Sequence, residues 1–400
     1  MPADNAIPSG PRCRLAVVLS HPTQYYSPWF RWLAAHTALE LRVFYLWDFG
    51  VTARTDPRFG TTFAWDVDLL SGYAHEFVPN RSRRPGTEHF GGLDNPELAA
   101  RVAAWRPDAA LVFGYRYRTH LGFLAWARRQ RLPLIFRGDS HLIDQPPLGL
   151  LKRWMLAWVF RQFAAVTFVG QANRDYFRTF GVPEGKLHFA PHAVDTSLFD
   201  STRLDHRTAA AALRTELGLA PATRVMLFAG KFHPEKQPRA LLAAFLALAP
   251  RDTSLVFVGD GAEKAALIEA AQAAPPGTVH ILPFANQSAM PARYLLADLF
   301  VLPSLGLYET WGLAVNEAMH LGVPCLVSHR VGCQRDLVTE GETGWVFRAG
   351  DHAHLQSQLA AALAADPAPL RSRIAGRIAG YTYASAAAGL QAAVAAVTRA

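Results

Sequence analysis

Short apolar runs separated by longer helical segments form the main pattern of the first half of the chain. The runs lie at residues 15–20, 41–47, 109–113, 134–136, 166–169 and 187–189. Consecutive apolar residues of this kind are typical of strands buried on both faces of a parallel sheet. Helical segments at 30–35 and 96–105 lie between them. The alternation predicts a doubly wound α/β sheet.

The same pattern restarts after a polar interval at residues 195–223. Further apolar runs follow at 225–229, 255–258, 280–282, 299–302 and 325–327, with Ala-rich segments between them. Four hundred residues are also too many for one ordinary core. We therefore expect two α/β domains, residues 1–200 and 201–383, followed by a terminal helical segment, 384–400.

Two regions lack this regularity. Residues 49–93 are rich in Gly, Pro and Arg, with Arg81, Arg83 and Arg84 close together. Loops of this length are usually functional or mobile. The first twelve residues have no apolar segment of the signal-peptide type, so we expect a frayed tail.

Composition favours a globular cytoplasmic protein. Half of the residues are apolar and 18% are charged, a balance that excludes a disordered chain. The longest apolar run, 240–249, is too short to cross a bilayer. The three cysteines, Cys13, Cys325 and Cys333, have neither metal-ligand spacing nor the pattern of a disulfide framework, which fits a reducing compartment.

Positive charge is concentrated in the first half. Residues 1–195 carry 23 Lys and Arg against 16 Asp and Glu, whereas residues 196–400 carry 17 against 16. A basic half suggests an anionic partner such as a membrane surface. No zinc spacing, helix-turn-helix signal or aromatic and basic RNA motif is present, so nucleic acid is not expected.

Residues 148–163, LGLLKRWMLAWVFRQF, combine large apolar side chains with Lys152, Arg153 and Arg161. A basic amphipathic helix of this kind can lie in a membrane interface. It can equally be a packed helix of the first domain with a small exposed strip. The sequence leaves both interpretations open.

The most informative stretch is 303–322, PSLGLYETWGLAVNEAMHLG. It follows an apolar run, and its pattern becomes helical from Leu313. A loop that leads into a helix offers free backbone N–H groups and the positive end of a dipole, which suit a phosphate. Glu309 precedes the helix and Glu317 lies about one turn inside it. Carboxylates beside such a site are good acceptors for sugar hydroxyls.

This stretch resembles the donor-site signature of the retaining family 4 glycosyltransferases of the B fold. The signature is an E-x7-E pair within a fixed frame, which here reads Pro303-Ser304, Glu309, Gly312-Leu313, Glu317-Ala318-Met319 and Gly322-Val323-Pro324. Trp311 stands where the family commonly has Phe. The neighbouring Gly-Gly with a downstream Glu is altered to Gly332-Cys333 with Asp336.

The resemblance implies a B-fold enzyme with two Rossmann-like domains that face a central cleft. It would transfer a hexose with retention from a nucleotide-diphosphate sugar to a glycan or lipid-linked acceptor, in polysaccharide or glycolipid synthesis. The nucleotide sugar is a substrate, and no cofactor is implied. The last helix would cross back to the N-terminal, acceptor-side domain. An epimerase, a phosphorylase-like enzyme and an inactive binding protein remain as alternatives.

Several residues are candidates for donor binding. Gly230 and Lys231 end one apolar run and Lys236 follows in the next loop. Lysines near such a turn suit a diphosphate, although surface lysines are the plain alternative. By resemblance, Gly259 and Phe284 would flank the base, with a core Phe as the alternative for Phe284.

On the N-terminal side, the ends of apolar runs again carry polar residues. His141 follows the run at 134–136, and Asp139 is its expected partner. By resemblance His141 would touch the donor sugar and act in catalysis with Glu309 and Lys236, although a structural histidine is the alternative. His21 follows the first run, and we expect its loop to face the acceptor.

No metal site is expected. Asp66 and Asp68 form a D-x-D pattern, but they lie in the irregular region 49–93. Lysines and a helix dipole can offset the charge of a leaving diphosphate without a metal.

Overall fold

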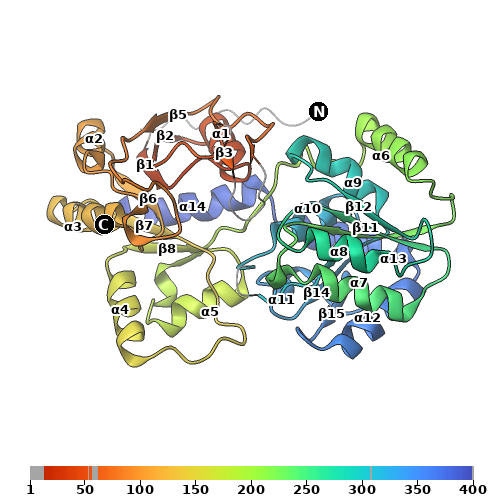
Figure 1. The fold of residues 1–400 in the computed structure, drawn as a ribbon. Helices are drawn as coiled ribbons and strands as arrows, with labels where there is room; N and C mark the ends of the chain where they lie inside the picture. Colours follow the sequence, from red (N-terminus) through yellow and green to blue (C-terminus); the bar gives the residue numbers. More distant parts are fainter. Residues whose placement is uncertain (1–12, 53, 56–61, 307–308, 399–400) are drawn as a thin grey trace.

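A seven-stranded sheet forms the centre of the first half of the chain (Figure 1). The structure is a computed structural model, and it describes residues 13–52, 54–55, 62–306 and 309–398. All its neighbouring strands are parallel, in the order β5-β2-β1-β6-β7-β8-β9. The strands are β1 (Cys13–Leu19), β2 (Leu39–Tyr45), β5 (Ala74–Phe77), β6 (Ala109–Phe113), β7 (Leu134–Arg137), β8 (Ala165–Phe168) and β9 (Leu187–Phe189). The expected tail at residues 1–12 lies outside the described residues.

Helices cover both faces of this sheet. Alternate residues of β1 explain the arrangement, since Ala16 and Val18 face one apolar cluster and Leu15 and Val17 face the other. The first cluster includes α2 (Leu98–Trp105), α3 (Arg118–Gln130), α4 (Leu150–Arg161) and α5 (Gln171–Thr179). The second includes α1 (Tyr26–His36) and α14 (Tyr383–Thr398). Short helical turns lie at η1 (Phe90–Gly92) and η2 (Glu184–Lys186).

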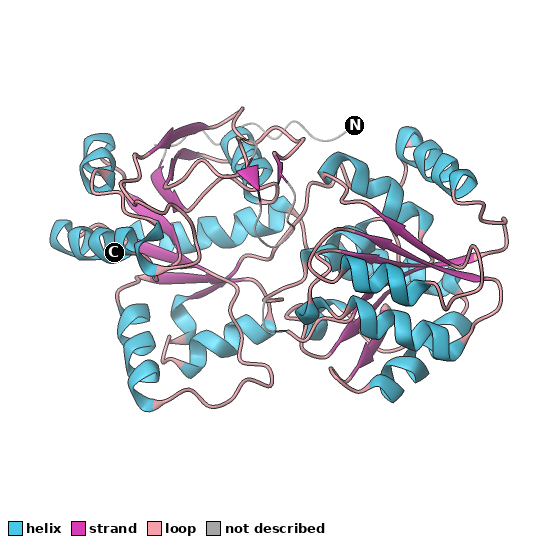
Figure 2. Cartoon of the chain, in the orientation of Figure 1, coloured by secondary structure: helices cyan, strands magenta, loops and turns pink. Residues whose placement is uncertain are grey.

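A six-stranded parallel sheet forms the second half, in the order β12-β11-β10-β13-β14-β15 (Figure 2). Its strands are β10 (Arg224–Ala229), β11 (Thr253–Val258), β12 (Val279–Leu282), β13 (Leu299–Leu302), β14 (Cys325–Ser328) and β15 (Gly344–Phe347). Its helices are α6 (Leu204–Glu216), α7 (Pro238–Leu248), α8 (Lys264–Ala271), α9 (Met290–Leu296), α10 (Leu313–His320), α11 (Gln334–Leu337), α12 (His352–Ala364) and α13 (Pro367–Ile378), with turns at η3 (Pro234–Lys236) and η4 (Gln287–Ala289).

Both sheets share one topology. The first three strands of each sheet run outward from its middle, and the next strand returns to the other side of the first. This is the doubly wound order, in which ligands bind beyond the carboxyl ends of the strands where the winding reverses. The predicted fold class is therefore confirmed. We propose that the two units, divided near residue 200, are the domains of the protein.

The prediction of one irregular region at 49–93 was wrong in part. Residues 74–77 form β5, which pairs in parallel with β2, and β3 (Arg54–Thr55) pairs with β4 (Thr62–Phe63) in an antiparallel ribbon. Strand β5 is an edge strand whose four residues are exposed or half-buried, so it lacks the continuous apolar run that marks the inner strands. Strand β15 was also missed, because its short run begins with a glycine.

Helix α14 returns from the end of the second half to cover the first sheet, as the blue helix in the left half of Figure 1 shows. Its buried face packs in the same apolar cluster as α1. Gly389 allows the close approach, because a Cβ atom there would lie 1.8 Å from the carbonyl oxygen of Phe189 on β9. The last helix therefore ties the two halves together.

We predict that Gly389→Ala lowers the melting temperature. The added methyl group forces a shift of α14 against backbone, and overpacking of this kind typically costs ~1–3 kcal/mol. Gly376→Ala in α13 is the matched control, since a Cβ atom there meets nothing within 4 Å. The control is expected to be neutral or stabilising by up to ~1 kcal/mol. Thermal unfolding measures both variants, and equal melting temperatures would contradict this account.

Candidate active site

A cavity of about 470 Å³ lies between the two sheets, beyond the carboxyl ends of their strands. The first half contributes residues after β1, β2, β4 and β7: His21, Thr23, Gln24, Tyr25, Phe49, Trp65 and Asp139. The second half contributes the ends of β10 and β11, the loops after β12 and β13, and the first turns of α9 and α10. The volume is in the range of small-molecule sites in proteins.

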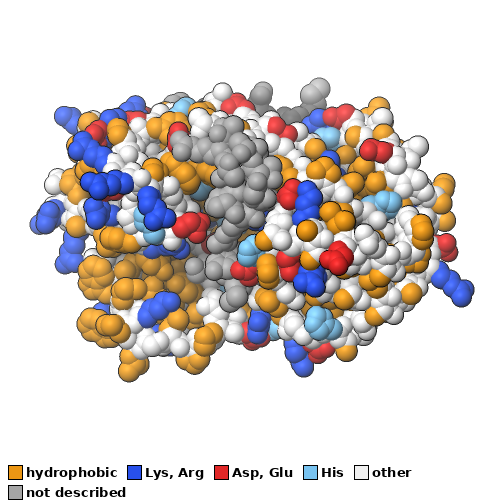
Figure 3. Space-filling view, in the orientation of Figure 1, with side chains coloured by type: hydrophobic (Ala, Val, Ile, Leu, Met, Phe, Trp, Pro, Cys, Tyr) orange, Lys and Arg blue, Asp and Glu red, His pale blue; other side chains and the backbone are white. Residues whose placement is uncertain are grey.

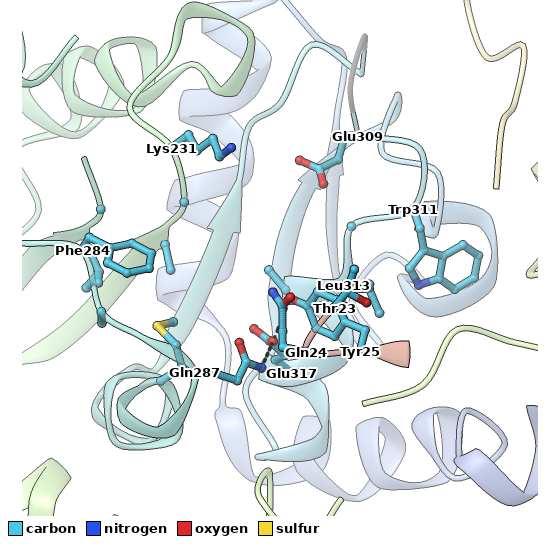
Figure 4. Close-up of a pocket in the computed structure, with 18 of the residues that line it drawn as sticks. Thr23, Gln24, Tyr25, Lys231, Phe284, Gln287, Glu309, Trp311, Leu313 and Glu317 are labelled. Atoms are coloured by element: carbon cyan, nitrogen blue, oxygen red, sulfur yellow. Dashed lines mark hydrogen bonds between the residues drawn. The ribbon is translucent and has the colours of Figure 1, made fainter. Parts of the chain in front are cut away.

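Glu317 lies at one end of the cavity, inside α10 (Figure 4). Glu317 is 3% exposed, and its carboxylate accepts three hydrogen bonds. Tyr25 Oη donates at 3.0 Å, Gln287 Nε2 at 2.9 Å and Tyr294 Oη at 2.7 Å. Burial raises the pKa of Glu317, and the three hydrogen bonds oppose that shift. The hydroxyl of Tyr25 is the contribution from the other half of the chain.

The opposite end of the cavity carries positive charge. Lys236 Nζ donates to Glu309 Oε2, and Lys231 extends into the same space from the loop after β10 (Figure 4). Gly312 and Leu313, at the start of α10, also line the cavity. Gly312 precedes the helix with φ at 99°, which favours glycine. Among the described residues no side chain caps this helix end, so its first N–H groups lack a side-chain partner there and can meet an anion.

Phe284 and Gly259 line the cavity on the side of β11 and β12. Trp65 from the first half lines it too, and the segment that carries Trp65 is bound to the second half. Asp66 accepts from the backbone N–H of Ser288 at 3.1 Å and from its hydroxyl. Asn286 Nδ2 donates to the carbonyl oxygen of Ala64 at 2.7 Å. Residues 64–66 thus form a strap across this end of the cavity.

Asp66 and Asp68 form the D-x-D pattern that is not expected to bind a metal. In the structure both carboxylates contact other residues of the protein. Asp66 binds Ser288, as above, and Asp68 pairs with Arg31 at 3.2 Å. Within the part of the chain that the structure describes, no group of three or more His, Cys, Asp or Glu side chains has the arrangement of a metal site.

Asp139 lines the cavity but has other partners than expected. Thr310 Oγ1 donates to Asp139 Oδ2 at 2.8 Å across the two halves, and His192 Nε2 lies 3.4 Å from the same oxygen. Burial favours the neutral acid, but these hydrogen bonds and the charge of His192 outweigh it and lower the pKa of Asp139. His192, not His141, is therefore its histidine partner. The motif after β7 could not indicate this, because His192 is 53 residues away.

The other two histidines differ in position. His141 is buried and does not line the cavity; its Nε2 lies 3.5 Å from the carbonyl oxygen of Glu309, and its Nδ1 accepts from the N–H of Ile143 at 3.2 Å. His21 does line the cavity, edge-on to Trp47 and Phe49. Burial lowers the pKa of His21 to about 4, so its ring is neutral near pH 7.

Every other candidate donor or catalytic residue named from the sequence lines the cavity. Sequence reasoning missed Tyr25, Gln287 and Tyr294, the three donors to Glu317. Tyr25 lies in the loop between the first strand and α1, so its position beyond a strand end was a usable signal. Gln287 and Tyr294 lie in a short turn and a helix, where the sequence pattern shows only packing.

Two family models match the chain. One, described as Glycosyltransferase Family 4, covers residues 51–198, and the other, Glycosyl transferases group 1, covers residues 211–378. The chain belongs to glycosyltransferase family 4. It is a glycosyltransferase that uses a nucleotide sugar.

Relatives within family 4 are moderately similar. The D-inositol 3-phosphate glycosyltransferase of Nocardia farcinica is 28% identical over 342 residues, which cover 75% of this chain and 72% of the relative. The protein of the same name from Rhodococcus jostii is 35% identical over 287 residues, 64% of this chain and 61% of the relative. The sulfoquinovosyl transferase SQD2 of Arabidopsis thaliana is 25% identical over 274 residues, 64% of this chain and 50% of the relative.

Solved structures share the fold at low sequence identity. The structure of Anabaena Alr3699/HepE in complex with UDP has a TM-score of 0.71 and 18% identity, covering 95% of this chain and 98% of that one. A glycosyltransferase from Rickettsia africae has a TM-score of 0.74 and 11% identity, covering 96% and 98%. These similarities confirm the predicted B-fold arrangement.

Asp336, where this chain departs from the family signature, joins the two halves beside the cavity. Both of its carboxylate oxygens lie 3.1 Å from the backbone nitrogen of Gln171, which donates at the start of α5. Burial raises the pKa of Asp336 to about 6. A carboxyl whose pKa is higher in the folded state stabilises the fold at low pH, and this contribution is lost as pH rises.

We predict that Asp336→Asn changes the pH dependence of stability. The difference in stability between wild type and variant should shrink by roughly 2–3 kcal/mol between pH 4 and pH 7, because the wild-type contribution is lost as pH rises through about 6. Melting temperatures across this range measure the change. Glu342→Gln, at an exposed turn, is the control for removal of one carboxylate. A constant difference between wild type and Asp336→Asn would refute the assignment.

Proposed function

We propose that the protein transfers a hexose, with retention of anomeric configuration, from a nucleoside-diphosphate sugar to a glycan or lipid-linked acceptor. The observation that carries this proposal is the polarity of the cavity. The buried carboxylate of Glu317 lies at one end, and Lys231 with the Lys236–Glu309 pair lies at the other. This suits a ligand with hydroxyls at one end and a diphosphate at the other. The setting we propose is synthesis of cell-surface polysaccharide or glycolipid in the cytoplasm, at the inner face of the membrane.

At the nucleoside end, we assign the ribose hydroxyls to Glu317 and the base to the space beside Phe284 and Gly259. A carboxylate offers about four lone-pair positions, of which three are used here. Tyr25 donates to Glu317 from the opposite half of the chain. When the two halves move apart, a ribose hydroxyl can replace the Tyr25 hydroxyl as a donor to Glu317. Structures of Anabaena HepE are described with UDP and with UDP-glucose, which supports a uridine nucleotide.

At the diphosphate end, we assign Lys231, Lys236 and the first N–H groups of α10 to the phosphates. Negative charge grows on the diphosphate as the glycosidic bond lengthens, and fixed positive charge stabilises it most at that point. The proposal needs no metal ion.

At the reacting centre, we assign Glu309 to the hexose and His21 and Asp139 to the acceptor side. Glu309 is held by Lys236, and its backbone carbonyl contacts His141. His141 thus acts in this proposal by positioning Glu309. The neutral ring of His21 can accept a hydrogen bond from an acceptor hydroxyl.

A panel of nucleotide sugars tests the proposal. The true donor should raise the melting temperature, because it binds the folded state alone. Analysis of the reaction products then separates the alternatives. Release of nucleoside diphosphate with transfer to an acceptor supports the proposal, whereas recovery of an epimerised nucleotide sugar indicates an epimerase. Consumption of a glycan with phosphate indicates a phosphorylase, and binding without turnover over a broad panel of acceptors indicates an inactive binding protein.

We predict that Glu317→Ala raises the KM for the donor. Ribose hydroxyls that lose their hydrogen-bond acceptor cost roughly 1–3 kcal/mol of donor binding free energy, which corresponds to an increase of about 5- to 150-fold in KM. Steady-state kinetics measure the change, and circular dichroism checks the fold. Glu317→Gln, which keeps the side-chain shape, should give a smaller increase, and Glu269→Ala on the exposed surface of α8 is the control. An unchanged KM in a folded Glu317→Ala protein would exclude this role.

We predict that Lys236→Ala lowers kcat more than donor affinity, by on the order of 10²–10³-fold, as expected for removal of one preorganised donor. Lys236→Arg should restore only part of the rate, because the guanidinium is larger and planar. Lys264→Ala is the control, since Lys264 pairs with Asp260 at 2.8 Å and does not line the cavity. Activity should also survive a chelator. Loss of turnover that added manganese restores would overturn the metal-free assignment.

A further inference from the structure

Helix α4 carries a large exposed apolar surface. Leu150, Leu151, Trp154, Met155 and Trp158 are between 48% and 86% exposed. They follow the spacing i, i+1, i+4, i+5 and i+8, which covers an arc of about 140° on one side of a helix with 3.6 residues per turn. Half of the ten exposed large apolar side chains identified among the described residues belong to this one helix. We call these five side chains the α4 face.

The other side of α4 is fully used in the fold. Leu156, Val159 and Phe160 are at most 3% exposed and pack in the apolar cluster under the first sheet. Residues 148–163 thus contain a helix that packs by one side and exposes the other, and the membrane-interface interpretation stays a prediction. In the space-filling view the apolar side chains gather on the lower left, where Figure 1 places α4 (Figure 3).

Positive charge surrounds the α4 face. Exposed Lys152, Arg153 and Arg161 lie on the helix itself. Helix α3 ends beside it, because Arg128 Nη1 donates to Gln162 Oε1 at 3.2 Å. Arg129 and Arg131, exposed at that end of α3, extend the basic border. An apolar face with such a border suits the interface of an anionic lipid layer.

Acidic side chains are scarce around the α4 face. Residues 118–163 contain eight Lys and Arg but only two acidic residues, Asp139 and Asp144. Asp139 lines the cavity, and Asp144 pairs with Arg330 of the second half at 3.3 Å. A second copy docked symmetrically on this face would bring two basic borders together, which is unfavourable. Charge complementarity thus favours an anionic surface over self-association.

We propose that the α4 face binds the surface of a lipid bilayer that contains anionic phospholipids, with Trp154 and Trp158 in the interface and the basic border on the headgroups. The helix lies on the surface and does not span the bilayer; no helix among the described residues is long and apolar enough to do so. Because α4 belongs to the same half as the residues assigned to the acceptor, binding would hold that half at the membrane. The proposal does not depend on the donor or on the reaction.

Sedimentation with vesicles tests the proposal. Vesicles of phosphatidylcholine with 30 mol% phosphatidylglycerol, about a third anionic lipid as suits a basic patch, are compared with pure phosphatidylcholine at low and high salt. We expect at least tenfold stronger binding to the anionic vesicles, weakened by salt. Trp154→Ser with Trp158→Ser should reduce this binding about tenfold. Ile268→Ser is the matched control, since Ile268 is 46% exposed on α8 in the other half.

Charge and insertion have separate readouts. Lys152→Glu with Arg153→Glu should abolish the preference for anionic vesicles, whereas Arg251→Glu, at an exposed turn of the second half, should not. Brominated lipids should quench the tryptophan fluorescence of the wild type. Trp154→Phe with Trp158→Phe should bind vesicles but lose most of that quenching.

Each contrary result overturns the proposal. Absence of vesicle binding, equal binding to both vesicle types, or full binding by the serine variant excludes the α4 face as a lipid site. A concentration-dependent dimer that the serine variant abolishes identifies a second copy as the occupant. Thermal stabilisation by nucleotide sugars is measured on the same variants without vesicles, and it shows whether the donor site is intact. Failure of the membrane proposal is thereby distinguished from failure of the proposed function.

Discussion

The arrangement of the cavity depends on one buried carboxylate, that of Glu317. A buried carboxylate is costly unless hydrogen bonds compensate for the lost water. Its three donors come from three places in the chain, namely Tyr25 before α1, Gln287 in η4 and Tyr294 in α9. These bonds hold α9 and η4 against α10 and bring the first half to the second. Burial still raises the pKa of Glu317, so the donors offset its cost only in part. A ligand that donates further hydrogen bonds there would stabilise the ionised form, which is why a ribose is a suitable partner.

Several of the contacts between the two halves are polar contacts to carboxylates. Asp66 binds Ser288, Asp139 binds Thr310, and Asp336 binds Gln171, each across the boundary. Polar interfaces of this kind resemble transient ones, and relative motion of domains is then the default expectation. Helix α14 differs, because its apolar face is buried in the first sheet's core while the chain enters it from the second half. The structure thus combines a permanent tie at α14 with separable contacts around the cavity, as substrate entry into a closed cleft requires.

Much of the fold could be predicted from the sequence, because inner strands of parallel sheets are continuous apolar runs. The edge strand β5 could not, since half-exposed residues leave no such run. In the site, Glu309 and Glu317 could be found because their spacing and the following helix are local features. Tyr25, His192 and the strap at Asp66 act through contacts across 292, 53 and 222 residues, and no local pattern encodes those. The α4 face could be predicted only in part. The sequence shows that this helix is apolar and basic, but only the fold determines which of its sides packs against the protein.

Calorimetric titration with a nucleoside diphosphate and its 2′,3′-dideoxy analogue tests the assignment of Glu317 most directly. The nucleoside is the one identified from the donor panel. If Glu317 binds the ribose hydroxyls, wild type should bind the dideoxy analogue roughly 10- to 100-fold more weakly, as expected for loss of hydrogen bonds to a buried charged group. Glu317→Gln should lose most of that discrimination, while Lys236→Ala should keep it. Equal discrimination by wild type and Glu317→Gln would contradict the account, because the hydroxyls would then bind elsewhere.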